Sequence, residues 1–199
     1  MSLFQSKPVK EKIVEGLLDL EGHPDILQSL VDMQNEIGVG FDMKVLAITS
    51  IHNDKMAAAF AKAFADVFAH NGSSSLIIDA SLYKPSLAGV LGLTGCTHEL
   101  RVLNDKISVL CSDKEVYPSK LFREKEVQRV IEENKRNFDH IIVLVPAVRE
   151  HKEIALLKGV IDSAIIVTQR NITQKKDIFD AACFFQAEDL PLSKVVILK

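Results

Sequence analysis

The side chains that could bind a phosphate or carry a proton follow three apolar runs, which end at Thr49, Asp79 and Val145. In an open parallel sheet, ligands bind beyond the carboxyl ends of the strands, so these three loops are candidate sites. The first loop reads TSIHNDKMAAAF and leads directly into a helical pattern. A phosphate-binding loop at this position needs glycines that let backbone amides wrap the anion, a lysine that neutralises its charge, and a hydroxyl that holds magnesium.

The elements that must position these loops are indicated by the hydrophobic pattern. Six short, β-branched apolar runs have the character of buried strands, and most are separated by amphipathic stretches of helical period. Because a helix must carry the chain back before the next parallel strand can pair, this alternation predicts an α/β fold with a doubly wound, mainly parallel sheet. The runs are residues 44–49, 76–79, 107–111, 140–145, 164–168 and 195–198.

Two further amphipathic segments, residues 8–20 and 24–37, precede the first strand. They predict an N-terminal helical arm over residues 1–40, ahead of a larger domain over residues 41–199. The arm could cover a face of the sheet, or its apolar residues could pack against another subunit and form a homodimer. Composition does not choose between these two uses.

Charge and hydropathy exclude several classes of function. The net charge is −3, and no run of lysine and arginine is longer than two residues, so nucleic-acid binding is not expected. The first ten residues lack the apolar region of a signal peptide. The longest apolar run, residues 141–148, is interrupted by Pro146 and is too short to span a bilayer. We therefore expect a cytoplasmic protein without direct membrane insertion.

The cysteines and histidines do not have the spacing of a metal site. Cys96, Cys111 and Cys183 are widely separated and odd in number, which is typical of reduced thiols buried as small hydrophobic side chains. The pair His98-Glu99 has no second histidine four residues further on. No metal bound by protein ligands alone is expected.

Three segments carry a family resemblance. Residues 49–59 resemble the pattern TSxxxGxGKST, DASLYKPSLAGVLGL at residues 79–93 is similar to DxDxRxPSLxxxxGL, and FDHIIVLVPAV at residues 138–148 is similar to YDxIIIDxPPV. From about Lys44 onward the chain resembles the bacterial tyrosine kinases of capsule and exopolysaccharide loci, relatives of the MinD/ParA-type deviant Walker ATPases. The resemblance implies a P-loop NTPase-like fold. It also implies a protein partner, either an active kinase or a membrane activator of the polysaccharide co-polymerase type.

The first loop departs from the family pattern at every position that handles phosphate. Asp54 and Met56 stand where the family has glycines, Ala57 replaces the lysine, and Ala58 replaces the magnesium-binding hydroxyl. Without a cation the charge of a triphosphate is uncompensated, so no ATP or other cofactor is expected. We expect the vestigial loop, residues 53–58, to end in a capped helix, with Asn53 or Asp54 as the capping residue.

The acidic motifs also depart from the family pattern. Asp79 is kept, but Ser81 and Leu144 replace the other two aspartates, so no pair of magnesium ligands remains. Asp79 could be a remnant general base or second-shell magnesium partner, or it could cap the turn over residues 80–85. Lys55 could be a surviving catalytic lysine, or a plain solvated side chain.

Two other features of the family kinases are also missing. Tyr83 and Tyr117 are the only tyrosines, so no tyrosine cluster ends the chain. Residues 25–36 contain no arginine, whereas the family's ExxRxxR oligomerisation motif requires two. Neither autophosphorylation nor ring formation of the family type is expected.

These departures support the hypothesis of a non-catalytic, kinase-like pseudo-ATPase. Such a module would be a regulator or scaffold in capsular or exopolysaccharide biosynthesis, peripheral to the inner face of the cell membrane through a partner. One alternative is a weakly active ATP-binding tyrosine kinase or ATPase that uses ATP and magnesium through Lys55 and Asp79. Another is a MinD/ParA-like positioning protein, which would need a nucleotide-driven dimer switch.

Overall fold

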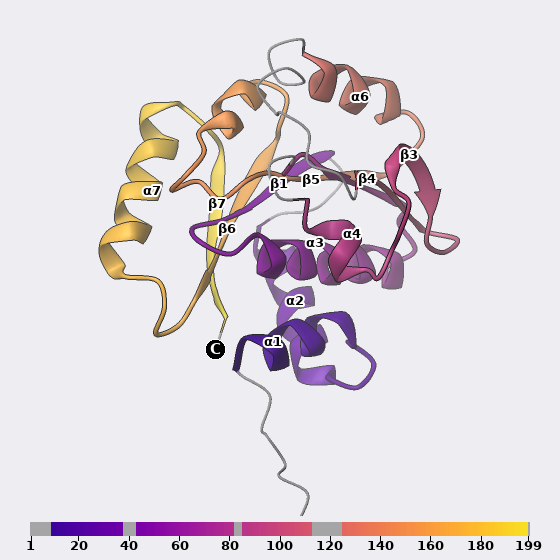
Figure 1. Ribbon diagram of the computed structural model, residues 1–199, viewed down its shortest axis with the longest axis horizontal. Coiled ribbons are helices and arrows are strands. Elements are labelled where there is room, and N and C mark those ends of the chain that lie inside the picture. Colours follow the sequence, from indigo (N-terminus) through magenta and orange to yellow (C-terminus); the bar gives the residue numbers. More distant parts are fainter. Residues whose placement is uncertain (1–8, 38–42, 82–84, 113–124, 199) are drawn as a thin grey trace, which may run out of the picture.

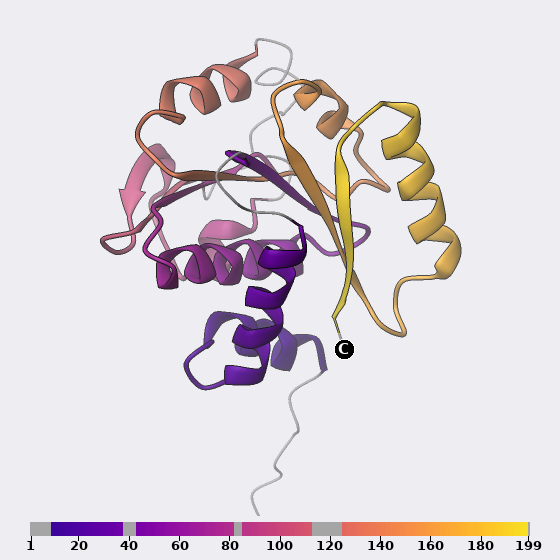
Figure 2. The same cartoon turned by 180° about the vertical axis from the view of Figure 1, so that it is seen from behind.

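The computed structural model describes residues 9–37, 43–81, 85–112 and 125–198 of the chain. Within these ranges a sheet is covered by helices on both faces, as Figures 1 and 2 show. The strands are β1 (Val45–Ser50), β2 (Ser75–Asp79), β3 (Thr97–Val102), β4 (Ile107–Ser112), β5 (His140–Leu144), β6 (Ser163–Gln169) and β7 (Leu192–Leu198). The helices are α1 (Val9–Leu18), α2 (Pro24–Glu36), α3 (Asp54–His70), α4 (Leu87–Val90), α6 (Glu126–Asn134), the 3₁₀ turn η1 (Glu153–Leu157) and α7 (Lys175–Ala187).

The sheet has the strand order β3-β4-β2-β5-β1-β6-β7, and every neighbouring pair is parallel except β3 with β4. The predicted doubly wound, mainly parallel sheet is therefore confirmed. All six predicted strands are present, with boundaries shifted by up to three residues. Strand β3 was not predicted, because it lies at an edge, where Leu100 and Val102 are 52% and 71% exposed and the buried pattern of a central strand is absent.

Two hydrophobic cores fill the two faces of the sheet. One lies under α3 and α4, and the other under α6, η1 and α7. In α3, Phe60, Phe64 and Phe68 are four residues apart and form a row, with ring centroids separated by 5.8 and 5.2 Å. Phe68 continues this row onto strand β5, where its ring stacks on His140 at 4.0 Å. Helix α3, which contains residues 54–58 of the vestigial loop, is thus firmly seated on the sheet.

Helix α3 ends just before Gly72. This glycine has a φ of +85°, a left-handed conformation that residues with a side chain rarely adopt. The backbone N–H of Ser73 donates to the carbonyl of Phe68 at 2.9 Å, as in a Schellman motif. The helix therefore stops where β2 must begin.

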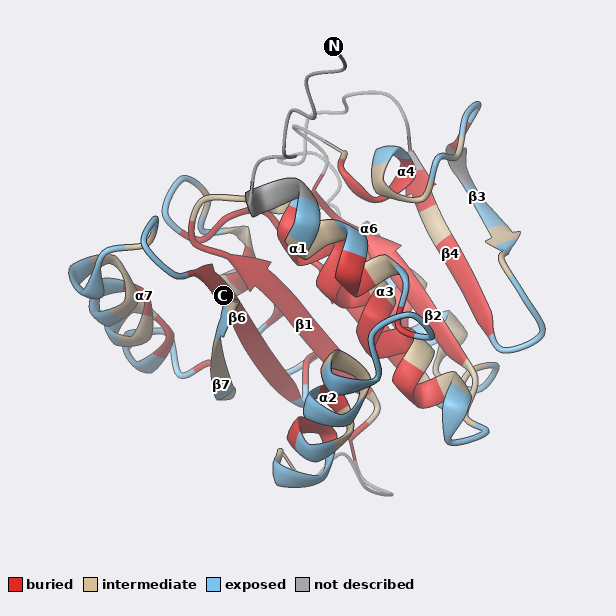
Figure 3. Cartoon of the chain, turned by 90° about the horizontal axis from the view of Figure 1, so that it is seen from below, coloured by how far each residue is buried: buried red, intermediate tan, exposed pale blue. Residues whose placement is uncertain are grey.

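The helical arm packs mainly on α3. Leu17, Leu30 and Met33 of the arm are buried in the same core as α3. Figure 1 shows α3 between the sheet and the arm, and Figure 3 shows the molecule from the side of the arm, coloured by burial. Where the two arm helices meet, a Cβ on Gly16 would lie only 2.9 Å from Cδ1 of Ile26, so glycine permits the close approach. The division of the chain near residue 40 stays a prediction, because residues 38–42 lie outside the described ranges.

None of the helices in the described ranges combines the length and the apolarity that crossing a bilayer requires.

Candidate functional site

The vestigial loop lies at the carboxyl ends of β1, β2 and β5, as the sequence predicts for a ligand site in this fold. The hydroxyl of Thr49 donates to the carbonyl of Pro146 at 2.8 Å, and the N–H of Val148 donates to the carbonyl of Ser50 at 2.9 Å. These bonds join the end of β1 to the segment that follows β5. The start of the loop is therefore fixed to the segment that follows β5.

Asn53 is the capping residue of α3, which confirms one of the two predicted caps. Its backbone is extended, and its side-chain carbonyl accepts a hydrogen bond from the N–H of Met56 at 3.3 Å. Its own N–H donates to the hydroxyl of Ser50 at 3.0 Å. Donors that could hold a phosphate in an intact loop are used here within the protein.

Asp54 begins α3, and its carboxylate is turned toward the interior. It accepts a hydrogen bond from the backbone N–H of Ala147 and lies 3.5 Å from the hydroxyl of Ser50. Burial raises the pKa of the Asp54 carboxyl above its ordinary value, although the bond from Ala147 opposes the shift. A carboxylate therefore lies between the loop and the end of β5.

The next residues divide between solvent and core. Lys55 is exposed, whereas Met56, Ala57 and Ala58 are buried with exposed fractions of 1%, 0% and 0%. The two alanines, which stand where the family has its lysine and hydroxyl, face the protein core. Lys55 lies on the opposite, solvated side of the helix start.

Asp79, at the end of β2, is enclosed by backbone amides. Its carboxylate accepts hydrogen bonds from the N–H groups of Ser81 at 2.9 Å, Ser86 at 3.2 Å and Leu87 at 3.0 Å. These bonds span the turn after β2 and the start of α4, so the predicted capping role is confirmed.

The protonation of Asp79 is unusual for an aspartate. Burial raises its pKa to about 6 against the opposing effect of the three hydrogen bonds, and the charge of Asp54 adds to the rise. Its register neighbour on β5 is Leu144, which is fully buried and apolar. The carboxylate thus has backbone donors beside it, where a metal site would need a second carboxylate.

Several positions named from the sequence cannot be placed. Tyr83 and Tyr117 lie outside the described residues. Among the cysteines, Cys96 and Cys111 are buried as predicted, but the same prediction was wrong for Cys183, which is exposed on α7. In the described ranges, no group of three or more histidine, cysteine or acidic residues could hold a metal ion.

The sequence did not indicate a second polar cluster beside the loop. His52 Nε2 lies 3.2 Å from Oδ2 of Asp177, and Nη1 of Arg149 lies 3.3 Å from Oδ1 of the same carboxylate. Next to this cluster, a cavity of about 400 Å³ is bounded by Arg149, Lys152 and Lys176 together with Asp177 and Asp180. His52 and Asp177 are 125 positions apart, so no local motif could have revealed their contact.

No protein-family model matches the chain, and no curated protein sequence matches it either. Solved structures do match. The chimerical protein CapA2B2 has a TM-score of 0.81 at 18% sequence identity, over 92% of this chain and 89% of that one. The kinase domain of the Escherichia coli tyrosine kinase ETK has a TM-score of 0.73 at 14% identity, over 86% of this chain and 74% of that one.

A third match lies outside the kinases. The cell division ATPase MinD of Pyrococcus furiosus has a TM-score of 0.63 at 16% identity, over 77% of this chain and 71% of that one. At these identities the comparisons establish the fold. The resemblance inferred from the sequence is confirmed at that level: the chain has the P-loop NTPase-like α/β fold shared by bacterial tyrosine kinase domains and MinD ATPases.

Proposed function

We propose that this protein is a non-catalytic, kinase-like module that acts by binding other proteins, as a regulator or scaffold in capsular or exopolysaccharide biosynthesis. The observation that carries the proposal is the Asn53–Asp54 turn. The side-chain carbonyl of Asn53 takes the N–H of Met56, a donor that a nucleotide-binding loop would present to phosphate, and the carboxylate of Asp54 lies between this loop and the end of β5.

Electrostatics at the turn oppose a nucleotide. A unit negative charge, such as that of a phosphate oxygen, about 4 Å from the ionised Asp54 carboxylate would be repelled by about 4 kcal/mol at an effective dielectric constant of about 20. A second carboxyl group, that of Asp79, lies close enough to Asp54 for the charge of Asp54 to raise its pKa. The nearest lysine in the loop, Lys55, is on the solvated side of the helix start.

The packing of the helix start also opposes nucleotide binding. Ala57 and Ala58 are fully buried, so a long cationic side chain at either position would need space that the core occupies. Met56, at a position where the family has glycine, fills the first turn of α3 with a buried side chain. The loop therefore lacks both the flexible backbone and the open space that wrap a phosphate.

The partner and the location follow from the family resemblance. A module without nucleotide chemistry would act through contacts with an active kinase or with a membrane activator of the co-polymerase type. Such a contact would hold the protein at the inner face of the cell membrane. Nucleic acid is not part of this proposal, since the chain has a net charge of −3.

Isothermal titration of the full chain with ATP and magnesium tests the proposal. We expect no saturable heat. Saturable binding at micromolar concentrations would contradict the proposal and favour the alternative of a weakly active ATPase or kinase.

Phosphate release adds a second measurement, in which the wild type and Lys55→Ala are compared. Equal background rates are expected from both proteins. A rate that falls in Lys55→Ala would show that this lysine takes part in catalysis.

A further inference from the structure

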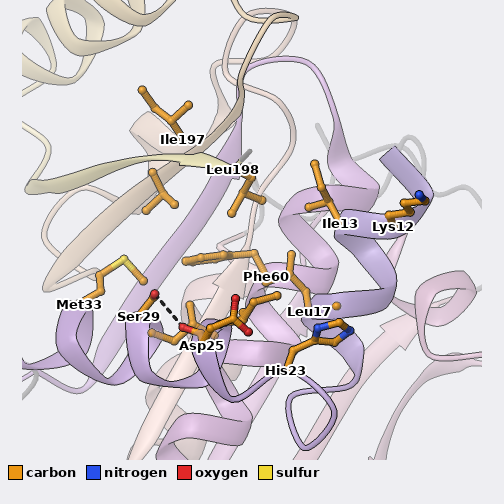
Figure 4. Close-up of a pocket in the computed structure, with 14 residues that line it drawn as sticks. Lys12, Ile13, Leu17, His23, Asp25, Ser29, Met33, Phe60, Ile197 and Leu198 are labelled. Carbon is orange, nitrogen blue, oxygen red and sulfur yellow. Dashed lines mark hydrogen bonds between the residues drawn. The ribbon is translucent and has the colours of Figure 1, made fainter. Parts of the chain in front are cut away.

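A groove with a volume of about 630 Å³ runs between the helical arm and the edge strand β7, and it shares no lining residue with the Asn53–Asp54 turn. Figure 4 shows its walls. Apolar side chains come from all the surrounding elements, and the arm adds the polar side chains of Lys12, His23, Asp25 and Ser29. Among the apolar residues that line the groove are Leu17, Leu30, Met33, Phe60, Val196 and Leu198.

The strand side of the groove is an unpaired sheet edge. Strand β7 is last in the sheet and pairs with β6 alone among the described strands. The carbonyl of Leu198 accepts from the N–H of Arg170 at 2.9 Å, and the carbonyl of Val196 accepts from the hydroxyl of Thr168 at 2.9 Å. Val196 and Leu198 therefore direct their carbonyl groups toward β6.

Alternate residues of a parallel strand bond to opposite neighbours, so the N–H and C=O groups of Val195 and Ile197 point toward the open edge. Val196, Ile197 and Leu198 all line the groove, although successive side chains of a strand point to opposite faces. A cavity that touches three consecutive residues must run along the strand edge.

The helix side of the groove is α2. Lys194 of β7 forms an ion pair with Glu36 in the last turn of α2, which ties strand and helix together at one end. At the other end, the groove is lined by Leu198 and by Ile13 of α1. Between these ends, an edge strand and a helix flank an apolar floor that includes Phe60 of α3.

We propose that this groove binds an extended peptide of a partner protein, which adds a strand to the free edge of β7. Main-chain hydrogen bonds to Val195 and Ile197 would provide affinity, and alternate side chains of the peptide would enter the apolar floor and provide specificity. The chemistry that fits is a short extended segment with apolar residues at every second position.

A second copy of this chain fits the groove less well. If two β7 strands paired antiparallel with Val196 facing its symmetry mate, the copy's Lys194 would lie opposite Leu198. That arrangement would place an ammonium group at the apolar end of the groove and remove it from Glu36. A peptide with apolar side chains at these positions avoids both costs.

Selection of short random peptides, displayed on phage, against the full-length chain tests this proposal. We expect enriched sequences with apolar residues in alternation. A synthetic copy of an enriched peptide, carrying a fluorescent label, should bind with an affinity that Ser29→Trp lowers by at least about tenfold. Ser29 is exposed and lines the groove, so tryptophan would fill it.

Gln28→Trp is the matched control, because Gln28 is also exposed on α2 but does not line the groove. It should leave peptide affinity within about twofold. A peptide N-methylated at the amides that face β7 should bind at least about tenfold more weakly, because it cannot add a strand. The comparison with the N-methylated peptide uses the wild-type protein, so it tests the proposal even if Ser29→Trp does not fold.

Hydrogen exchange gives an independent readout, in which bound peptide should slow the amides of Val195 and Ile197. The proposal would be overturned if no alternating sequence is enriched, if Ser29→Trp and N-methylation leave affinity unchanged, or if those amides are unaffected. Sedimentation that shows a wild-type dimer, dissociated by Ser29→Trp, would assign the groove to a second copy and also overturn it. Because the groove and the Asn53–Asp54 turn share no residue, none of these results depends on the nucleotide titration.

Discussion

His52 Nε2 lies 3.2 Å from Oδ2 of Asp177, a contact that joins the segment between β1 and the vestigial loop to the first turn of α7. Arg149, in the segment after β5, reaches the other oxygen of the same carboxylate at 3.3 Å. Three segments that are distant in sequence therefore meet at Asp177. This cluster holds the loop in place by contacts within the protein.

Asp177→Asn should reduce the dependence of stability on pH at the acidic end. Burial raises the pKa of the Asp177 carboxyl, but the hydrogen bond from His52 and the charge of Arg149 outweigh it, and the pKa is lowered. A lowered pKa contributes stability that is present above the ordinary value of about 4 and is lost as the pH falls below it. Urea unfolding from pH 3 to pH 6 should show a flatter profile for the variant.

Asp180→Asn is the control for Asp177→Asn, because it removes an exposed carboxylate from the same helix. Its profile should follow the wild type. A wild-type profile for Asp177→Asn as well would show that the cluster contributes nothing to stability.

Asn53→Ala should destabilise the protein by about 1 kcal/mol, since it removes the acceptor for the N–H of Met56. Asn53→Ser should recover most of that loss, because a serine hydroxyl can accept the same bond. The free energy of unfolding in urea measures both effects. Equal losses in the two variants would mean that capping is not the role of the Asn53 side chain.

Lys55→Ala and Ala57→Lys should have very different effects. Removing the exposed Lys55 side chain should change stability by no more than about 0.5 kcal/mol. Introducing a lysine at the fully buried position 57 should cost at least about 2 kcal/mol, because it forces a charge and extra volume into the core. Thermal unfolding of the two variants compares them, and a well-tolerated Ala57→Lys would show that the site has room for a catalytic lysine.

Asp79→Asn should change how stability responds to pH near neutrality. Burial raises the pKa of Asp79 to about 6, so its protonated form adds stability that is fully present below about pH 4 and is lost as the pH rises through 6. The stability of the wild type relative to the variant should therefore fall by about 2 to 3 kcal/mol between pH 4 and pH 7. Urea titrations at several pH values measure this difference.

Asp139→Asn is the opposite-sign control for Asp79→Asn. Hydrogen bonds from the backbone and side chain of Ser74 lower the pKa of Asp139, so its contribution is lost only as the pH falls below the ordinary value. Its profile should depart from the wild type only at the acidic end. A constant offset between wild type and Asp79→Asn across the range would show that Asp79 does not titrate there.

The central strands and the capped loop could be predicted from the sequence, whereas two other features could not. Runs such as residues 140–145 are buried on both faces, so their apolar character alone marks them as strands. Strand β3 escaped prediction because half-exposed edge residues such as Leu100 carry no continuous apolar signal. The exposure of Cys183 depends on which face of α7 meets the sheet, which a single cysteine does not reveal.

What the sequence by itself determined is the fold class and the replacement of each phosphate-handling residue from Asp54 to Ala58, because strand periodicity and residue type are local properties of the chain. Only the tertiary structure decided that Asp54 turns inward to Ala147, that His52 meets Asp177, and that the arm and β7 enclose a groove. Each of these contacts joins segments distant along the chain, and the packing of helices and strands determines which side chains meet there.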